Sequence, residues 1–288
     1  MMHNPVKYPT THKFVSLAAL AAFVLVTACA PVTDQQTITV KGSDTMVQLG
    51  QRWAEVYMNA DPDAVIQVTG GGSGTGIAAL INGSTDIAQA SREMKDEEKE
   101  SALEQRGAAV VETAVALDAL AVYLNDSNPV DVLTIAQIDG IFRGEVTNWS
   151  QVGGNDAAIV LYGRENSSGT YVYFKEEVMA DADFASAYQA LPGTAAVISA
   201  VASDPNGVGY GGIGYASGIK TVSISPVEGD DPIEPSEENV LTNRYPLSRN
   251  LFFYTIGEPS GLVGEFVDWT LSPEGQAIVN EVGYYPLR

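Results

Sequence analysis

The sequence predicts an α/β fold in which short strands alternate with helices. Runs rich in β-branched residues at 37–42, 64–70 and 85–91 are each followed by a segment with a helical pattern. Apolar residues make up 45% of the chain and charged residues 18%, a composition typical of a globular protein rather than a disordered one. Alternation of this kind predicts helices layered on largely parallel sheets.

Residues 1–28 have the features of a bacterial secretory signal peptide. Two lysines precede an uncharged run of about 13 residues, Phe14–Val26, which is too short to span a membrane. The run leads into "VTAC" (26–29), which resembles the lipobox of lipoproteins. We therefore expect cleavage before Cys29, lipidation of that cysteine, and a tether over residues 29–35. An ordinary signal peptide with an incidental cysteine is the alternative.

Cleavage at Cys29 would change which functions are available to the chain. Both histidines, His3 and His12, lie in the predicted leader, so the mature chain would have no imidazole and no free thiol. This excludes Ser-His-Asp catalysis, Cys-His catalysis and histidine zinc sites. The mature chain would keep 13 basic and 36 acidic residues, a net charge of −23, which disfavours nucleic acid as a partner. We expect no cofactor and no metal.

The first block of elements ends near residue 124. Met46, Leu49, Trp53 and Tyr57 recur at helical spacing after the first strand, which predicts a helix with one buried face. The other segments are predicted as a helix after a glycine-rich loop, a charged exposed helix ending at a glycine, and a long apolar strand: 75–83, 96–107 and 110–125.

The second block begins near residue 125. Ile135, Ile138, Ile141 and Phe142 predict the buried face of a helix over 133–144. Two closing helices are expected, the second with Ser272 as its N-cap and Pro273 at its first position. The other segments are, in order, a strand, a glycine-rich strand, an acidic surface loop, a strand and the two helices: 158–164, 207–216, 228–239, 249–257, 260–271 and 272–282.

Four of the predicted strands end in segments rich in glycine and small hydroxyl residues. These are "GSDT", "GGGSGTG", "QASR" and "RENSSGT", at 42–45, 70–76, 89–92 and 164–170. At least three of them precede a helix, whose N-terminus offers unpaired N–H groups and a positive dipole end. Loops of this kind gather at the carboxyl ends of strands, so the four can converge on one anion site.

The glycine-rich loop at 70–76 allows several interpretations. A nucleotide-binding P-loop is excluded, because no lysine occurs between Lys41 and Lys95. A dinucleotide fingerprint fits loosely, but this is the second strand–helix turn and Asp86 follows too closely. A structural turn without a ligand remains an alternative. The interpretation we favour is a small tetrahedral anion bound by Ser73 and by backbone N–H groups of the loop.

Seven longer motifs connect the sequence to a known family. They are "KGSDT", "VTGGGSGTGI", "TDIAQASREMK", "TNWSQVGG", "GRENSSGTYVYF", "GGIGYA" and "YPLSRNLFFY". In this order they resemble the phosphate-binding proteins of phosphate ABC importers, from about residue 37 to the C-terminus. The resemblance implies a two-lobed type II periplasmic-binding-protein fold, a Venus flytrap, with mixed sheets flanked by helices and hinge strands between lobes. Lobe I would be residues 36–124 plus 248–288, and lobe II residues 125–247.

The resemblance also implies a set of phosphate-binding residues. Arg164 is the cation expected to grip the anion with its planar fork, although a surface salt bridge is the alternative. The full set expected from the family's motifs is Ser43, Asp44, Thr45, Ser73, Ser91, Arg164, Ser168, Gly169 and Thr170.

One position departs from the family pattern. Family members place an aspartate after the third strand, where it accepts the proton of HPO4²⁻ and so rejects sulfate. Here that position is Ser91, and Asp44 is the candidate replacement, unless it only caps its helix. Arg92 follows, and it either reaches the anion or pairs with Glu93 or Glu55.

The expected function is the capture of inorganic phosphate outside the cytoplasm and its delivery to an ABC permease. The protein would be a monomer anchored to the membrane through Cys29. Three alternatives remain. The chain could bind another oxyanion, such as sulfate, molybdate, tungstate or a phosphonate. It could be an enzyme such as a phosphatase, which the absence of histidine disfavours. It could also be a signalling or adhesion lipoprotein that kept the fold and lost transport.

Overall fold

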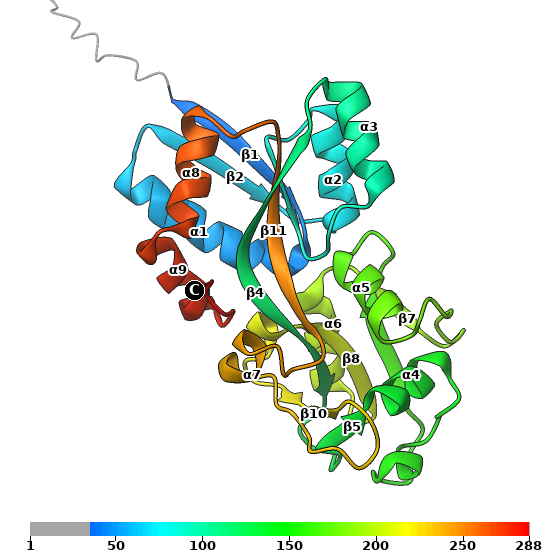
Figure 1. Ribbon diagram of the computed structural model, residues 1–288. Helices are drawn as coiled ribbons and strands as arrows, with labels where there is room; N and C mark the ends of the chain where they lie inside the picture. Colours follow the sequence, from blue (N-terminus) through cyan, green and yellow to red (C-terminus); the bar gives the residue numbers. More distant parts are fainter. Residues whose placement is uncertain (1–34, 288) are drawn as a thin grey trace, which may run out of the picture. The chain divides into compact units, whose positions relative to one another are not determined.

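The structure, a computed structural model, describes residues 35–287 (Figure 1). Residues 1–28, Cys29 and most of the predicted tether therefore lie outside the described residues. The strands are β1 (Gln36–Gly42), β2 (Ala64–Thr69), β3 (Ile87–Ala90), β4 (Val110–Leu124), β5 (Val132–Thr134), β6 (Val160–Arg164), β7 (Gln189–Leu191), β8 (Gly207–Gly212), β9 (Lys220–Thr221), β10 (Ser223–Ser225) and β11 (Ser248–Ile256). The α-helices are α1 (Val47–Ala60), α2 (Ser73–Asn82), α3 (Asp96–Arg106), α4 (Ile135–Arg143), α5 (Gly169–Glu177), α6 (Thr194–Ser203), α7 (Glu237–Leu241), α8 (Gly261–Leu271) and α9 (Pro273–Val282). Short 3-10 turns are η1 (Asp44–Met46), η2 (Trp149–Val152) and η3 (Ile213–Tyr215).

The main sheet is mixed rather than largely parallel. Its strands run in the order β2-β1-β3-β11-β4-β8-β6-β7, with β9 paired to β4. The outer pairs, such as β1 with β2 and β6 with β7, are parallel. The central pairs of β3 with β11, β11 with β4, and β4 with β8 are antiparallel. The prediction of largely parallel pairing is therefore wrong at the centre, because β4 and β11 pass through it in opposite directions.

The long strands β4 and β11 lie side by side and connect two hydrophobic cores (Figure 1). One core draws on residues between 38 and 116 and between 251 and 284. The other draws on residues between 119 and 247. Both cores belong to one compact unit. The changeover from one core to the other lies near residue 118 in β4 and near residue 249 in β11. The lobe boundaries at 124/125 and 247/248 stay a prediction.

In the first core, strand alternation sends side chains to two different helix layers. Phe253 packs with Trp53 of α1, with ring centroids 5.6 Å apart in an edge-to-face arrangement. Its neighbours Phe252 and Tyr254 point to the other face, where they join Ile77 of α2 and other residues. This is the two-residue period expected of a strand that is buried on both faces.

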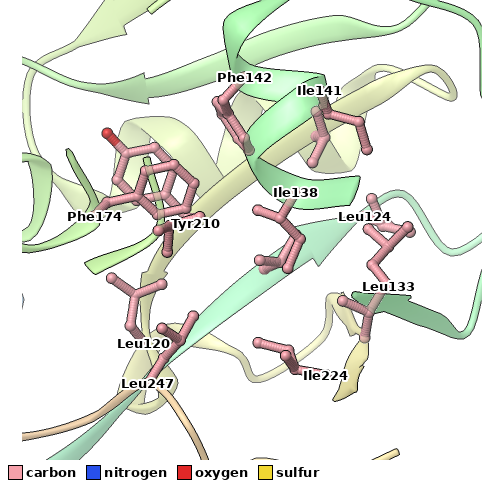
Figure 2. Packing of buried hydrophobic residues seen from close by; sticks show 14 of the residues in the cluster. Leu120, Leu124, Leu133, Ile138, Ile141, Phe142, Phe174, Tyr210, Ile224 and Leu247 are labelled. Carbon is pink, nitrogen blue, oxygen red and sulfur yellow. The ribbon is translucent and has the colours of Figure 1, made fainter. Parts of the chain in front are cut away.

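The second core is built around aromatic side chains and the predicted helix α4 (Figure 2). Ile138, Ile141 and Phe142 are buried, as the sequence predicts, whereas Ile135 is half-buried. Phe174 of α5 stacks on Tyr210 of β8, with centroids 3.9 Å apart and planes inclined by 11°. This packing fixes α5, and therefore the loop before it, against the sheet.

The structure confirms the predicted cap of the last helix and changes the bounds of two other predicted segments. Ser272 Oγ accepts a hydrogen bond from Gly275 N at 3.3 Å and Pro273 begins α9, so the predicted cap is confirmed. The glycine-rich strand is shorter than predicted, because β8 ends at residue 212 and a 3-10 turn follows. The acidic segment is mostly an exposed loop, but its end opens α7. Within residues 35–287, no helix is both long enough and apolar enough to cross a membrane.

Candidate functional site

Five buried hydroxyl groups from the four predicted loops meet at the junction of the two cores. Each of these residues is at most 1% exposed. We call them the hydroxyl cluster: Ser43, Thr45, Ser73, Ser91 and Thr170. The sequence predicted that these loops converge, and the structure brings the five side chains into one hydrogen-bonded group.

Ser91 lies at the centre of the hydroxyl cluster. Its Oγ accepts a hydrogen bond from Ser43 Oγ at 2.9 Å and lies 3.4 Å from Ser73 Oγ and 3.5 Å from Thr170 Oγ1. Thr170 Oγ1 in turn lies 2.8 Å from Thr45 Oγ1. Thr170 comes from the second core's α5, whereas the other hydroxyls come from loops around the first core. The cluster therefore connects the two halves of the protein, each of which is built around one of the two cores.

Local structure explains why these side chains meet. β1 ends at Gly42 and β3 at Ala90, so the residues after them leave the same edge of the sheet. α2 begins at Ser73 and α5 at Gly169, which places both helix N-termini at the cluster. Positive dipole ends and hydroxyl donors therefore point to one small region, an arrangement that favours an anion.

Arg164 is buried rather than a surface residue. Its side chain is 1% exposed, and its Nη2 pairs with Asp44 Oδ2 at 2.6 Å. Its Nη1 donates to Thr194 Oγ1 at 3.0 Å. Among the described residues, no group accepts a hydrogen bond from Arg164 Nε, although this atom is buried. Because an unsatisfied buried donor is costly, this N–H is a candidate contact for a ligand.

Asp44 joins three parts of the site. Its Oδ1 accepts from Gly71 N at 2.8 Å, and its Oδ2 pairs with Arg164. Its main-chain oxygen accepts from Tyr215 Oη at 2.9 Å. Burial raises the pKa of Tyr215 to about 12, so this phenol stays a donor at neutral pH. The carboxylate thus bonds to the glycine loop and to the arginine of the second half, and not to its own helix.

Three backbone N–H groups of the glycine loop donate to other parts of the protein. Gly71 N donates to Asp44, Gly72 N to the oxygen of Gly42 at 2.9 Å, and Gly74 N to the oxygen of Ser167 at 3.0 Å. These three amides therefore bond to protein acceptors in this structure. Gly72 has φ +91°, and a Cβ there would lie 2.4 Å from Ser167 O, so the close contact between the halves requires glycine.

Ser168 and Gly169 have separate positions. Ser168 is the N-cap of α5, and its Oγ accepts from Tyr171 N at 3.4 Å rather than joining the hydroxyl cluster. Gly169 lies against the cluster, because a Cβ added there would be 2.3 Å from Ser73 Oγ and 2.9 Å from Ser91 Oγ. Of the predicted set, Ser168 thus positions the helix, and Gly169 provides room.

Arg92 pairs with a carboxylate that the sequence analysis did not name. Its Nη1 and Nη2 donate to the two oxygens of Glu98 at 2.8 and 2.7 Å, and Nη1 also donates to Glu93 O at 2.7 Å. The expected carboxylate partners are therefore wrong, and Glu55 pairs with Arg52 instead. Burial alone would raise the pKa of Glu98, but the bonds from Arg92 and from a backbone N–H lower it below its ordinary value.

Sequence reasoning missed a second buried ion pair at the hydroxyl cluster. Arg249 of β11 pairs with Asp118 of β4, with Nη2 and Oδ2 2.7 Å apart and exposed side-chain fractions of 3% and 0%. Arg249 Nη2 also donates to Thr170 Oγ1 at 3.0 Å. A signal was present, because each charge interrupts a long apolar strand, where an unpaired charge would be costly.

Comparisons with known proteins show what this chain is similar to. Residues 28–274 match the PBP superfamily domain. The chain is 38% identical over 263 residues to the phosphate-binding protein PstS of Pseudomonas aeruginosa, and the match covers 85% of this chain and 81% of that protein. It is 30% identical over 293 residues to the Bacillus subtilis phosphate-binding protein PstS, spanning 96% and 94%. A Clostridium perfringens structure described as a phosphate ABC transporter substrate-binding protein with bound phosphate has a TM-score of 0.79. It is 31% identical, and the match covers 88% of this chain and 100% of that one.

Proposed function

We propose that this chain, which belongs to the PBP superfamily and within it to the PstS phosphate-binding proteins, captures inorganic phosphate for an ABC importer. Its fold is the type II periplasmic-binding-protein fold. The observation that carries the proposal is the buried hydroxyl cluster together with Arg164, which pairs with Asp44 between Ser43 and Thr45 and whose Nε–H has no acceptor within residues 35–287.

The chemistry of these groups fits a tetrahedral oxyanion. Each hydroxyl that now bonds to a neighbouring hydroxyl can instead donate to an oxygen of phosphate, and Arg164 Nε can donate to another. Such donors replace the hydration shell that the anion loses on entering the site. Because they come from both halves of the protein, the anion stabilises the closed arrangement and drives closure by its differential affinity.

Asp44 supports selectivity for phosphate over sulfate. Each of its carboxylate oxygens already accepts one hydrogen bond, and a carboxylate oxygen can accept a second. We propose that Asp44 accepts the proton of HPO4²⁻, in the role that the family gives to an aspartate where this chain has Ser91. Sulfate has no proton to donate at neutral pH, so a carboxylate at this position would repel it.

Isothermal titration of the purified protein with phosphate, arsenate and sulfate tests both the capture of phosphate and the role of Asp44. We expect one phosphate per chain, competition by arsenate, and no displacement of phosphate by sulfate at about millimolar concentration. If phosphate releases no heat and does not protect against thermal unfolding, the proposed function is wrong. Phosphate binding that millimolar sulfate abolishes would leave capture of an oxyanion in place and remove the role of Asp44.

We also propose a cellular context, which the family and the predicted leader support. The protein acts outside the cytoplasm, as a monomer, with Cys29 lipidated and the ABC permease as its partner. It is not an enzyme, which agrees with the names of its relatives as binding proteins. We assign residues 36–124 plus 248–288 to lobe I and residues 125–247 to lobe II; the two hydrophobic cores support a division into two lobes, and they change over near residues 118 and 249.

A further inference from the structure

The buried pair of Arg249 and Asp118 lies where the two connecting strands pass between the cores. The two residues face each other in the antiparallel register of β4 and β11. Val115 and Ala116 of β4 pack in the first core, and Ala119 and Leu120 pack in the second. The pair is therefore at the place where any relative motion of the halves must bend the strands.

The guanidinium of Arg249 bonds to groups from three places. Nε and Nη2 donate to Asp118 Oδ2 at 2.9 and 2.7 Å. Nη1 donates to the main-chain oxygen of Ser91 at 3.1 Å, and Nη2 donates to Thr170 Oγ1 at 3.0 Å. The other carboxylate oxygen, Asp118 Oδ1, accepts from Ile213 N at 3.0 Å. One ion pair thus contacts the connecting strands, the loop after β3, the start of α5 and the turn after β8.

The bond to Thr170 has a consequence for proton positions. Arginine only donates, so Arg249 occupies a lone pair of Thr170 Oγ1. The Thr170 proton is then directed to the other side, where Thr45 Oγ1 and Ser91 Oγ lie. Ser73 has a parallel arrangement, because its Oγ accepts from Ser91 N at 3.1 Å. Fixed donors behind these hydroxyls favour protons that point into the site.

We propose that Arg249, held by Asp118, is a positioning residue for oxyanion binding, which orients Thr170 as a donor. This inference rests on the proposed function. Arg249 does not serve as a second cation for the anion, because each of its three guanidinium nitrogens already donates to a protein acceptor, whereas Arg164 Nε has no acceptor within residues 35–287. Its effect therefore passes through Thr170, and this makes the inference testable by a double-mutant cycle.

The cycle combines Arg249→Lys with Thr170→Val and measures phosphate affinity by isothermal titration. Lysine keeps the charge but lacks the planar fork that reaches Asp118, Ser91 and Thr170 together. We expect each single variant to bind about 10- to 100-fold more weakly, the effect of losing a hydrogen bond to a charged group. The double variant should bind within about threefold of Thr170→Val, because the arginine acts through that hydroxyl. Thr170→Ser, which keeps the hydroxyl, should restore most of the affinity.

Arg92→Lys is the matched control, since Arg92 is a nearly buried arginine that bonds to Glu98 and to no member of the hydroxyl cluster. It should bind phosphate as the unaltered protein does. Additive losses in the cycle, or an equal loss in Arg92→Lys, would overturn the inference while the proposed function stands. If Arg249→Lys does not fold, Asp118→Asn replaces it in the cycle, with the same expected coupling to Thr170. If the unaltered protein binds no phosphate, the proposed function fails, and this inference fails with it.

Discussion

Replacing Gly169 by alanine should separate closure on the ligand from stability of the ligand-free protein. The new Cβ would lie 2.3 Å from Ser73 Oγ and 2.9 Å from both Ser73 Cβ and Ser91 Oγ, closer than carbon atoms normally approach. Ser73 cannot turn away freely, because its Oγ accepts the hydrogen bond from Ser91 N. The halves would have to move apart to admit the methyl group, and the hydroxyl cluster would lose its geometry.

The size of the effect follows from overpacking a tight contact. An extra methyl group in such a place costs about 1–3 kcal/mol, so phosphate affinity should fall by about 5- to 150-fold. Gly169 is the first residue of α5, and its φ lies outside the left-handed region, so alanine suits the backbone there. We expect the halves to separate in the ligand-free protein, where alanine at this first helical position should leave the stability unchanged or raise it slightly.

Isothermal titration and thermal unfolding without phosphate measure the two effects. The expected outcome is weaker binding with an unchanged or slightly higher Tm. Gly140→Ala is the matched control, because its Cβ would lie 3.3 Å from a methyl group of Val146 within the same half. This control should bind phosphate normally. Phosphate binding by Gly169→Ala within threefold of the unaltered protein would show that Gly169 does not lie against the hydroxyl cluster in the phosphate-bound protein.

Three further predictions use other parts of the chain. Arg164→Ala should weaken phosphate binding by about 2–5 kcal/mol in titration, because it leaves Asp44 without its buried partner; affinity unchanged within threefold would remove Arg164 from the site. Glu98→Gln should lower the free energy of unfolding by about 1–2 kcal/mol at pH 7. Since folding lowers the pKa of Glu98 from its ordinary value of 4.5, this difference should be fully present above about pH 4.5 and should be lost as the pH falls further, through the lowered pKa of the folded protein. Urea unfolding at pH 7 and at a series of pH values below 4.5 measures it; a pH-independent difference would contradict the ion-pair origin. Cys29→Ser should leave the protein in the aqueous phase after detergent partition, whereas recovery in the detergent phase equal to the unaltered protein would exclude lipidation at Cys29.

The features that the sequence predicted well are those set by local patterns. The helix α4 was visible because Ile138, Ile141 and Phe142 recur at helical spacing. The four loops were visible because each joins a strand to small hydroxyl or glycine residues, and parallel strands bring such ends together. The short strands β5 and β7 were missed, since three residues are too few for a periodic pattern to show.

The partners of charged residues could not be predicted in the same way. Asp118 and Arg249 are 131 residues apart, and their contact depends on the register of two antiparallel strands. Arg92 pairs with Glu98 because the backbone turns before α3, and this turn places the Glu98 side chain beside Lys95 N and the guanidinium of Arg92. The contact therefore depends on loop geometry, which the sequence pattern does not show. Charges placed in apolar strands nevertheless indicate that a partner must exist, even where the sequence does not say which residue it is.

A crystal structure of the protein grown with phosphate tests the central claim most directly. We predict one tetrahedral anion between the two cores, within hydrogen-bond distance of Arg164 Nε and of hydroxyls from both halves, including Ser73 and Thr170. In that structure the hydroxyls should turn from one another towards the phosphate oxygens. Phosphate found elsewhere, with the hydroxyl cluster still bonded to itself and Arg164 Nε still without an acceptor, would contradict it.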